Sequence, residues 1–380
     1  MIRRILFVTR LLAGGGAERV ISVLANELPE QGYEVGIIIF NMAKDEYILD
    51  KKVCCFRFEH YDETCGNTIS RTMYRWKCLR SIIKSYHPDV VFPFLESAVR
   101  ETFIASRGLN VKMISTVRNL PQYDSKWKKY FYDFIYTHSN AVFLQTESQK
   151  QFFNQQIIYK SFVVPNPVNS VFLHIGKKRK ERERLKRIVT AGRLEPQKNH
   201  QLLIEAMHYI HKAHPECSLS IYGEGAEYER LVRLIDKLNA NDYIALKGRN
   251  NHLENVYEQA DLFILSSDYE GMPNALIEAM ASAMPCVSTD CLTGPKELIG
   301  DNQRGRLVPT RQVMKLSKAV IEMIESPKEA NELGKRAYNY ISEKLSPEKI
   351  TSLLIENCEK YMRKNYEKNF ANYRRSIKQK

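Results

Sequence analysis

The chain of 380 residues is long for a single domain and comfortable for two. Its hydrophobic content of 44% and charged content of 27% are those of a soluble globular protein, and no apolar run approaches the length that a membrane-spanning helix needs. The formal net charge of +13 bears on partners rather than on fold, and it leaves nucleic acid, anionic lipid and phosphorylated substrates as candidates.

The N-terminus and the cysteines bear on the cellular compartment. The first residues are basic and then apolar, but the apolar run is too short for a signal peptide and predicts a buried first strand. The eight cysteines include no C-x-x-C pair, so neither a disulfide framework nor a zinc site is indicated. His208, His211 and His214 recur at every third position, which favours a solvated helix face over a metal site. Together these features predict a cytoplasmic protein with reduced thiols.

The first half of the chain alternates short apolar runs with helical patterns, which predicts parallel β-α-β units. Gly14-Gly15-Gly16 lies between the first predicted strand and a helix, where glycine lets the backbone approach a ligand closely. The spacing is not G-x-G-x-x-G, so a dinucleotide fingerprint is absent. The predicted strands are 5–8, 35–40, 90–94, 112–116 and 142–145, and predicted helices include 18–28 and 70–86.

The second half repeats this rhythm. Prolines end the first half, and the charged stretch 177–184 predicts an exposed linker. Two β-α-β domains facing each other would leave a cleft at the carboxyl ends of both sheets, where α/β proteins bind ligands. The predicted strands are 187–190, 218–222, 244–247, 262–266, 286–289 and 306–308, and the predicted helices are 201–213, 227–238, 274–282, 314–324 and a long last one from 347 to about 371.

Two loops of the second half carry groups suited to a phosphorylated ligand. Arg193 and Lys198 follow the strand 187–190, and a guanidinium fork and a compact ammonium hold phosphate oxygens in complementary ways. A turn with Gly223 and Gly225 ends the strand 218–222. These positions are candidates for contacts with a diphosphate and with the nucleotide attached to it.

The segment from Glu270 to Glu278 is the most informative part of the chain. It holds two carboxylates with seven residues between them, and Pro273 is predicted at the first helical position, where its missing N–H has no consequence. The free amides of the first turn then lie between the acids and attract phosphate. One acid can meet a sugar hydroxyl and the other a ribose hydroxyl, which suits a nucleotide-sugar. Taken alone, the two acids would instead be solvated groups at a helix end.

This segment resembles the E-x7-E signature of retaining glycosyltransferases of family 4, and the resemblance extends from Gly14 to Pro309. It implies an α/β GT-B fold, in which two Rossmann-like β/α/β domains face each other across a cleft and a C-terminal helix crosses back to the first domain. The implied parts are an N-terminal acceptor-side domain (1–170), a linker (171–186), a C-terminal nucleotide-sugar-binding domain (187–346) and the returning helix with a basic tail (347–380).

The resemblance also implies roles for individual residues. Arg193, Lys198 and Glu270 are the expected catalytic residues, and Glu278 is the expected ribose ligand. Many relatives place a histidine where this chain has Arg118 and Asn119, so these two are expected on the acceptor side and the nature of that group is open. The other expected donor-binding residues are Gly15, Gly16, Gly192, Gly223, Gly225, Gly271, Met272, Pro273 and Asn274.

The implied reaction is transfer of a hexose with retention by front-face attack. A D-x-D triplet is absent, so Arg193, Lys198 and helix amides are expected to stabilise the leaving diphosphate in place of a metal ion. No metal and no cofactor are expected. The expected donor is a nucleotide-sugar, UDP-linked in preference to GDP-linked. The expected acceptor is a growing surface glycan of a capsule, lipopolysaccharide O-antigen or exopolysaccharide, carried on polyprenyl diphosphate.

Two tryptophans bear on the membrane. Trp76 and Trp127 both lie among cations and other aromatic residues, as in a lipid headgroup region. Ordinary helices with buried rings explain the composition equally well. The family resemblance favours peripheral attachment of the first domain to the inner face of the cell membrane, through a patch with Lys126, Lys128 and Lys129.

Other function classes stay open. A nucleotide-sugar epimerase or a phosphorylase of the same architecture is one alternative, although the acids and histidine of the first and the pyridoxal lysine motif of the second are not found. A non-catalytic, basic nucleic-acid-binding protein is the other. The basic runs are dispersed and no nucleic-acid-binding module is visible, so nucleic acid is not an expected partner.

Overall fold

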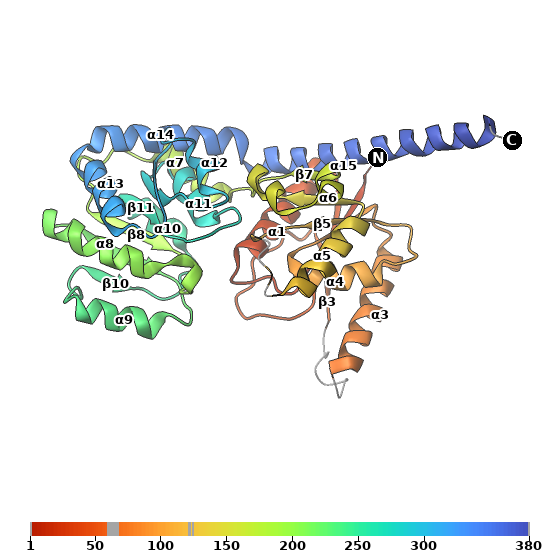
Figure 1. Cartoon of the computed structure of the whole chain (residues 1–380), viewed down its shortest axis with the longest axis horizontal. Helices are drawn as coiled ribbons and strands as arrows, with labels where there is room; N and C mark the ends of the chain where they lie inside the picture. The colour runs from red at the N-terminus through yellow and green to blue at the C-terminus, as the bar shows by residue number, and fades with distance from the viewer. Residues whose placement is uncertain (1, 59–67, 121–122, 124, 379–380) are drawn as a thin grey trace. The chain divides into compact units, whose positions relative to one another are not determined.

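The computed structural model describes residues 2–58, 68–120, 123 and 125–378, without the side chains of 68–69 and 363–378. The chain divides into two compact units (Figure 1). Unit 1 consists of Met1–Pro167 and Pro347–Lys380, and unit 2 consists of Val168–Ser346. Each unit has a sheet of parallel strands with helices packed against it.

The sheet of unit 1 has the strand order β3-β2-β1-β4-β5-β6-β7. Its central strands are short apolar runs because helices cover them and leave little polar surface. Phe7 and Phe92, on the adjacent strands β1 and β4, stack with ring centroids 5.6 Å apart. The strands are β1 (Arg4–Thr9), β2 (Glu34–Ile39), β3 (Cys54–Arg57), β4 (Val90–Pro93), β5 (Lys112–Thr116), β6 (Ala141–Leu144) and β7 (Ser161–Val163). The helices are α1 (Gly16–Glu27), η1 (Leu28–Gln31), α3 (Thr68–Tyr86), α4 (Leu95–Ala105), α5 (Lys126–His138), η2 (Glu147–Phe152), α6 (Gln155–Tyr159) and α15 (Pro347–Lys378).

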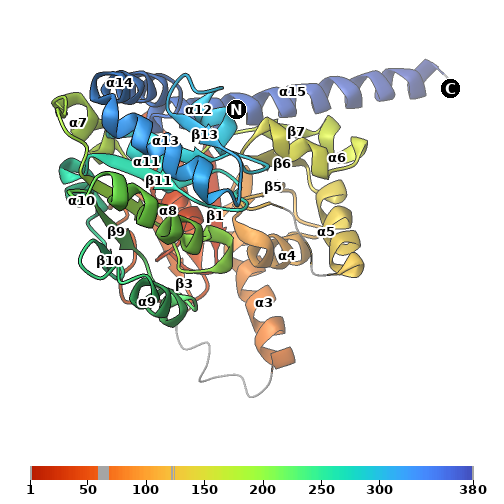
Figure 2. The ribbon, with the colours of Figure 1, turned by 60° about the vertical axis from the view of Figure 1, so that its left-hand side comes forward.

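The sheet of unit 2 has the strand order β10-β9-β8-β11-β12-β13. Helix α8 packs against α13, and α11 packs against α7 and α14 (Figures 1 and 2). The strands are β8 (Arg187–Ala191), β9 (Ser218–Tyr222), β10 (Ile244–Leu246), β11 (Leu262–Leu265), β12 (Cys286–Thr289) and β13 (Arg306–Val308). The helices are α7 (Ser170–Lys178), η3 (Pro196–Lys198), α8 (His200–Ala213), α9 (Tyr228–Lys237), α10 (Leu253–Gln259), α11 (Asn274–Ala281), α12 (Pro295–Ile299), α13 (Val313–Glu325) and α14 (Pro327–Lys344).

These sheets confirm the predicted fold class, and every predicted strand lies within two residues of an observed one. Two strands of unit 1, β3 and β7, were not predicted. Both are edge strands of three or four residues, and none of their residues is fully buried. A short edge strand lacks the continuous apolar run that marks a strand covered on both faces.

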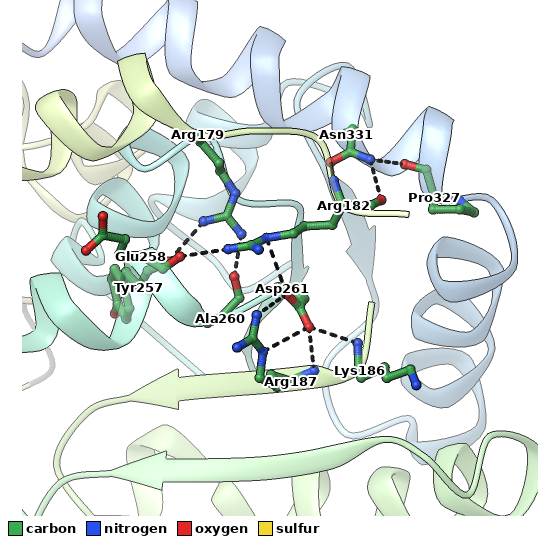
Figure 3. Close-up of polar contacts among 10 residues, drawn as sticks. All are labelled: Arg179, Arg182, Lys186, Arg187, Tyr257, Glu258, Ala260, Asp261, Pro327 and Asn331. Carbon is green, nitrogen blue, oxygen red and sulfur yellow. Dashed lines mark hydrogen bonds and ion pairs between the residues drawn. The ribbon is translucent and has the colours of Figure 1, made fainter. Parts of the chain in front are cut away.

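The prediction of a linker at 171–186 is wrong. Helix α7 occupies its first part, and α7 packs against α10, α11 and α14 of unit 2. Two arginines beyond α7 then close the end of α10 (Figure 3). Arg179 donates to the carbonyl of Tyr257 at 2.9 Å and also to that of Ala260, and Arg182 donates to that of Glu258 at 2.9 Å. Most side chains of 177–184 are exposed, as predicted, but Arg179 and Arg182 are partly covered and satisfy open carbonyls at a helix C-terminus.

An acid anchors the same region. Asp261, just before β11, accepts hydrogen bonds from the backbone N–H groups of Lys186 and Arg187 and from the Arg187 guanidinium, at 2.9–3.3 Å (Figure 3). Burial alone would raise the pKa of this carboxyl, but the hydrogen bonds from Arg187 and the backbone outweigh it and lower the pKa. Asp261 therefore holds the start of β8, at Lys186 and Arg187, next to the start of β11.

Helix α15 returns to unit 1, as the predicted fold has it. Its buried residues Ile350, Leu354, Ile355 and Cys358 lie on the face that packs against α1. Gln31 of η1 donates a hydrogen bond of 2.5 Å to Thr351, and the ring of Phe162 in β7 meets that of Tyr361 edge-on at 6.4 Å. Among the helices in the described part of the chain, none combines the length and the apolar character needed to cross a membrane.

Candidate functional site

The topology of unit 2 determines where a ligand site can form. Strand β8 lies between β9 and β11, so the chain runs outward in one direction through β9 and β10 and in the other through β11, β12 and β13. Loops from β8 and β11 therefore separate at the carboxyl edge of the sheet, and ligands of open α/β sheets bind at this switch point. The loop 192–199, with Arg193 and Lys198, follows β8, and the loop 266–273, with Glu270, follows β11, so both loops lie at this position.

Side chains and backbone join these two loops. Gln197 donates to the carbonyl of Tyr269 at 2.8 Å, and the Asp268 N–H donates to the carbonyl of Gln197 at 2.9 Å. Ser266 donates to the carbonyl of Lys198 at 2.9 Å. Asn199 donates to the Asp268 carboxylate at 3.0 Å, and Arg311 donates to the same carboxylate at 2.8 Å. The loops therefore form one hydrogen-bonded platform.

A buried ion pair lies on this platform. Lys198 Nζ is 2.6 Å from Glu270 Oε1, and Ser267 Oγ donates to the same oxygen at 2.6 Å. Glu270 is 5% exposed, and the carbonyl of this residue accepts a hydrogen bond from Thr293. An ammonium has three donors and a carboxylate has two oxygens. Among the described residues, Nζ has no hydrogen-bond partner other than Oε1, and Glu270 Oε2 has none, so both groups retain capacity for a ligand.

Helix α11 begins next to this pair. Pro273 is the N-cap, with φ −76° and ψ 105°, and the helix starts at Asn274. The prediction that Pro273 holds the first helical position is therefore wrong by one residue, because its ψ is extended. The Ile277 N–H donates to the Pro273 carbonyl at 3.1 Å. Glu278 lies in the second turn and is 2% exposed, so both acids of the signature are buried side chains.

Close backbone contacts explain the glycines of the loop after β9. A β-carbon on Gly223 would lie 1.8 Å from the carbonyl oxygen of Gly192, and one on Gly225 would lie 2.3 Å from that of Leu194. The Leu194 N–H donates to the carbonyl of Glu224 at 2.8 Å. The loops after β8 and β9 are therefore in direct backbone contact, which only glycine permits.

The loop after β12 completes the group. A β-carbon on Gly294 would lie 2.7 Å from both the Gly271 carbonyl oxygen and a Pro273 side-chain carbon, so this loop supports Gly271, Met272 and Pro273 from behind. Thr289 donates to the carbonyl of Ser267 at 2.6 Å. The Gly271–Asn274 segment thus has a fixed backbone before any ligand arrives.

Arg193 differs from Lys198. Its guanidinium is exposed and donates to Glu195 Oε1 at 2.8 Å, two residues along the same loop. Exposed ion pairs of this kind contribute little to stability, so the side chain is free to change partner. The structure brings Lys198 and Glu270 together and leaves Arg193 outside their hydrogen-bond network.

His200 was not predicted as a site residue from the sequence. It is the first residue of α8 and is buried beside the loop that carries Gly192 and Arg193. Burial, together with the positive charge of Lys198, lowers the pKa of His200 to about 4. A neutral imidazole is expected at neutral pH, and its position directly after Lys198-Asn199 is the only signal that the sequence offers.

The predicted site residues of unit 1 lie at the carboxyl edge of its own sheet. Gly15 is the N-cap of α1, and a β-carbon there would lie 2.0 Å from Oε2 of Glu18, whose carboxylate folds back over the helix start. This acid already balances the positive end of α1. Arg118 follows β5 and is buried, whereas the Asn119 side chain is exposed and its carbonyl accepts from Gln149 at 3.3 Å.

Two of the three regularly spaced histidines contact an aromatic ring and an acid. His211 stacks on Tyr243 with ring centroids 3.7 Å apart, and His214 lies 3.6 Å from Glu325. Within the described ranges, no group of three or more His, Cys, Asp or Glu side chains is placed to hold a metal ion.

Comparisons with known proteins bear on the family of the chain. Residues 14–171 match the family described as "Glycosyltransferase Family 4", and residues 174–340 match "Glycosyl transferases group 1". An uncharacterized glycosyltransferase of Haemophilus influenzae is 24% identical over 335 residues, which are 84% of this chain and 90% of that protein. The chain spans less than two thirds of the length of several other curated relatives.

Two further similarities are informative. The GalNAc-alpha-(1->4)-GalNAc-alpha-(1->3)-diNAcBac-PP-undecaprenol alpha-1,4-N-acetyl-D-galactosaminyltransferase of Campylobacter jejuni is 26% identical over 318 residues, 83% of this chain and 87% of that protein. A crystal structure of Staphylococcus aureus TarM with fondaparinux, alpha-GlcNAc-glycerol and UDP has a TM-score of 0.78 at 15% identity, covering 94% of this chain and 99% of that chain. The second similarity concerns the fold alone.

The two family matches follow each other along the chain, and together they span both parallel-sheet units. The chain therefore belongs to the GT-B glycosyltransferases, with a Glycosyltransferase Family 4 N-terminal half and a Glycosyl transferases group 1 C-terminal half.

Proposed function

We propose that this protein is a retaining, metal-independent hexosyltransferase that moves a hexose from a UDP-sugar to a polyprenyl-diphosphate-linked surface glycan. The observation that carries the proposal is the buried Lys198–Glu270 pair beside the start of α11. It places an ammonium with two open donors, a carboxylate with one open oxygen and a helix N-terminus within one platform. A sugar diphosphate has the complementary groups.

In this proposal the diphosphate lies at the first turn of α11. The amides of that turn and the two open N–H donors of Lys198 meet its oxygens, and the exposed Arg193 exchanges Glu195 for a phosphate oxygen. Their positive charge stabilises the negative charge that builds on the diphosphate as the sugar leaves. Lys198 needs no rearrangement because Glu270 already holds it in place.

The two acids hold the other parts of the donor. Glu270 Oε2 accepts a hydrogen bond from a hydroxyl of the transferred hexose, and Glu278 accepts from the ribose diol. The backbone comes close to the nucleotide at three glycines, Gly192, Gly223 and Gly225. The diphosphate is lined by Gly271, Met272 and Asn274. In unit 1, Gly15 and Gly16 approach the donor, and Arg118 and Asn119 serve the acceptor side.

The transfer is a single exchange at the anomeric carbon. The bond from C1 to the diphosphate oxygen breaks, and a bond from C1 to the acceptor oxygen forms on the same face. The acceptor's hydroxyl proton passes to the departing diphosphate, which carries away the bonding electron pair. A double displacement would instead require a protein nucleophile on the opposite face. In this proposal Glu270 positions the sugar and does not attack it.

The proposed substrates follow those named for two similar proteins. The TarM structure contains UDP, and the Campylobacter relative is named for an undecaprenyl-diphosphate-linked glycan acceptor. A lipid-linked acceptor requires an enzyme that works at a membrane surface. We therefore propose a cytoplasmic protein that attaches peripherally to the inner face of the cell membrane and does not act on nucleic acid.

Helix α5 provides the surface for this attachment. Trp127 is 84% exposed and Tyr130 is 67% exposed, and Phe131 and Phe134 are exposed on the same helix. Their spacing places them on neighbouring turns of one face. Trp76 does not belong to this face, because its indole N–H donates to the buried Glu101. Lys128 and Lys129 are paired with Glu96 and Asp133, so the aromatic rings rather than the lysines dominate the proposed contact.

Donor binding tests the proposal without an acceptor. A ligand that binds only the folded protein raises the melting temperature, so UDP and UDP-sugars are expected to stabilise the wild-type protein and GDP-sugars are not. Lys198→Met should weaken UDP-sugar binding and lower turnover by about 10²–10³. The charge-matched control is Lys177→Met, at an exposed position on α7. Full turnover with normal donor affinity in Lys198→Met would refute the proposed clamp.

The stability of the same variant separates catalysis from folding. Lys198→Met leaves Glu270 buried without its ion pair, which is expected to lower the free energy of unfolding by about 3 kcal/mol. The double variant Lys198→Met/Glu270→Gln should regain most of that stability and remain inactive. Recovery of activity in the double variant would show that the pair serves the fold alone.

A further inference from the structure

Unit 1 contains a buried guanidinium for which the described residues supply no counter-charge. Arg118 is 7% exposed, and its Nη1 donates to the side-chain oxygen of Asn166 at 3.1 Å. Its Cζ lies 4.2 Å from the ring centroid of Phe94. Across the described ranges, no carboxylate is placed to form an ion pair with Arg118, and no hydrogen bond satisfies its Nε. A buried charge without a partner is strongly unfavourable, and burial accordingly lowers the pKa of Arg118 to about 9.

The open part of this guanidinium has a defined geometry. Asn166 uses Nη1, so the free edge is the one formed by Nε and Nη2, for which the described residues supply no partner. Two parallel N–H groups on such an edge match the two oxygens of a carboxylate or a phosphate. Lysine cannot offer this pair, since its ammonium is a point charge. Arg118 is therefore arranged to receive an oxyanion side-on.

A second unsatisfied group lies beside it. Gln145 donates from Nε2 to the same Asn166 oxygen at 2.8 Å, while its own Oε1 is buried and has no hydrogen-bond partner in the described part of the chain. This oxygen requires a donor such as a hydroxyl. Asn166 thus joins an open cation edge and an open acceptor, and a ligand that carries both an oxyanion and a hydroxyl complements the pair.

The position of this cluster is that of a ligand site. Phe94 directly follows β4, Arg118 lies two residues after β5, Gln145 directly follows β6 and Asn166 lies three residues after β7. These are four neighbouring strands of one parallel sheet. Their carboxyl ends form the edge at which α/β sheets bind ligands. The aromatic ring of Phe94 under the guanidinium holds its plane in place.

We propose that Arg118 binds an oxyanion carried by a sugar substrate, and that Gln145 accepts a hydrogen bond from a neighbouring sugar hydroxyl. A uronic acid, with a carboxylate and hydroxyls on one ring, satisfies both groups. This inference rests on the proposed function, and it narrows the substrate class from a hexose to an anionic sugar. A phosphate on the acceptor offers the same chemistry from another source, and the experiment below separates the two.

The experiment measures binding to the full chain and to Arg118→Met and Arg118→Lys. The carboxylate arm compares UDP-glucuronic acid with UDP-glucose, and methyl glucuronide with methyl glucoside. The phosphate arm compares farnesyl phosphate with farnesol. Arg80→Met is the control, since Arg80 is a partly buried arginine of unit 1 whose Nη1 donates to the carbonyls of Ala105 and Arg107 at 2.8 and 2.6 Å.

In at least one arm, the wild-type protein and Arg80→Met should bind the anionic member more tightly than its neutral counterpart. Arg118→Met should lower the affinity for that anionic probe by about 10–100-fold, as expected for the loss of a charged hydrogen-bonded pair. Its affinity for the neutral probe should be unchanged. Arg118→Lys should recover only part of the affinity. The arm that responds identifies the source of the oxyanion. Equal affinities of the wild-type protein and Arg118→Met for every anionic probe would overturn the inference.

Two further measurements separate a failure of the proposed function from a failure of the inference on Arg118. UDP itself reports on unit 2, so a protein that fails to bind UDP refutes the proposed function, while the methyl glycosides and farnesyl phosphate still test Arg118. Without ligand, Arg118→Met should melt at the wild-type temperature or above, because it removes an uncompensated buried charge. A fall in melting temperature as large as that of Arg80→Met would show that Arg118 holds the fold, and would also overturn the inference.

Discussion

Lys198 and His200 flank Asn199 at the start of α8, and their surroundings differ. Lys198 is held by a carboxylate that lies 2.6 Å from its ammonium. No carboxylate among the described residues pairs with His200, and burial, with Lys198 close by, lowers the pKa of His200 to about 4. Asn199 makes the arrangement possible, because it adopts a left-handed conformation with φ 44° and caps α8 by accepting from the Leu202 N–H at 3.2 Å.

A pH dependence of stability follows from His200. The unfolded chain binds a proton near pH 6.5, whereas the folded protein resists it until about pH 4, so acidification through this window favours unfolding. Between about pH 7 and pH 5, the wild-type protein should lose about 2 kcal/mol of unfolding free energy that His200→Gln does not lose. Urea denaturation at both pH values measures the difference, with the exposed His208→Gln as the control. Parallel losses in the wild-type protein and His200→Gln would contradict the assignment.

At the level of elements, neighbouring segments hold both ends of α11 in place. The loop with Gly294 packs behind Gly271, and α7 approaches the other end of the helix so closely that a β-carbon on Gly176 would lie 2.1 Å from the Ala281 carbonyl oxygen. Helix α7 is in turn followed by Arg179, which caps α10. The segment expected as a linker thus supports the helix that carries Glu278.

Helix α5 gives a prediction for a single element. Ser125 caps it by accepting from the Lys128 N–H at 3.2 Å, and its exposed rings are expected to enter a lipid headgroup region. Trp127→Ala and Tyr130→Ala should each weaken sedimentation with anionic liposomes by about tenfold or more, because each removes a large apolar contact. Tyr209→Ala, an exposed tyrosine on α8 of unit 2, is the control.

Charge reversal at the lysines completes that test. In the described part of the chain Lys126 has no ion-pair partner, whereas Lys128 lies 3.2 Å from Glu96 and Lys129 lies 2.6 Å from Asp133. Lys126→Glu should therefore weaken binding in a salt-dependent manner, by about 1 kcal/mol or more. Undiminished sedimentation of the aromatic and the Lys126 variants would exclude this face as the membrane contact.

At the scale of the whole molecule, the two units have separate cores, and the C-terminal segment belongs to the N-terminal one. Leu354 of α15 is buried in unit 1, and Leu333 of α14 is buried in unit 2, although only twenty residues separate them along the chain. A substitution in the core-facing side of α15 is therefore expected to change the stability of unit 1, which contains the N-terminal strands.

Hydrogen exchange tests this assignment of α15. Leu354→Ala should remove about 2–4 kcal/mol of stability and reduce amide protection in α1 and β1 of unit 1, while β8 and β9 keep theirs. Leu333→Ala, the same change in the other unit, should give the reverse pattern. Loss of protection in unit 2 upon Leu354→Ala would show that α15 does not belong to the core of unit 1.

The two parallel sheets and the helix start between Glu270 and Glu278 were predictable from the amino-acid pattern. Apolar runs covered on both faces and turn residues such as glycine and proline act locally, so the pattern shows them directly. It also singled out Lys198 and Arg118 as candidates, but not their surroundings.

The contacts of those charges depend on long-range packing and could not be predicted from the pattern. The Lys198–Glu270 pair joins loops from strands that are adjacent in the sheet but distant along the chain. Whether a described carboxylate lies near Arg118 likewise depends on the residues that four separate strands bring together. The charged stretch after α7 misled the prediction for the same reason, since Arg179 and Arg182 find their carbonyl partners on α10. The periodicity of apolar residues indicates whether a side chain is buried, but long-range packing determines which residue it contacts.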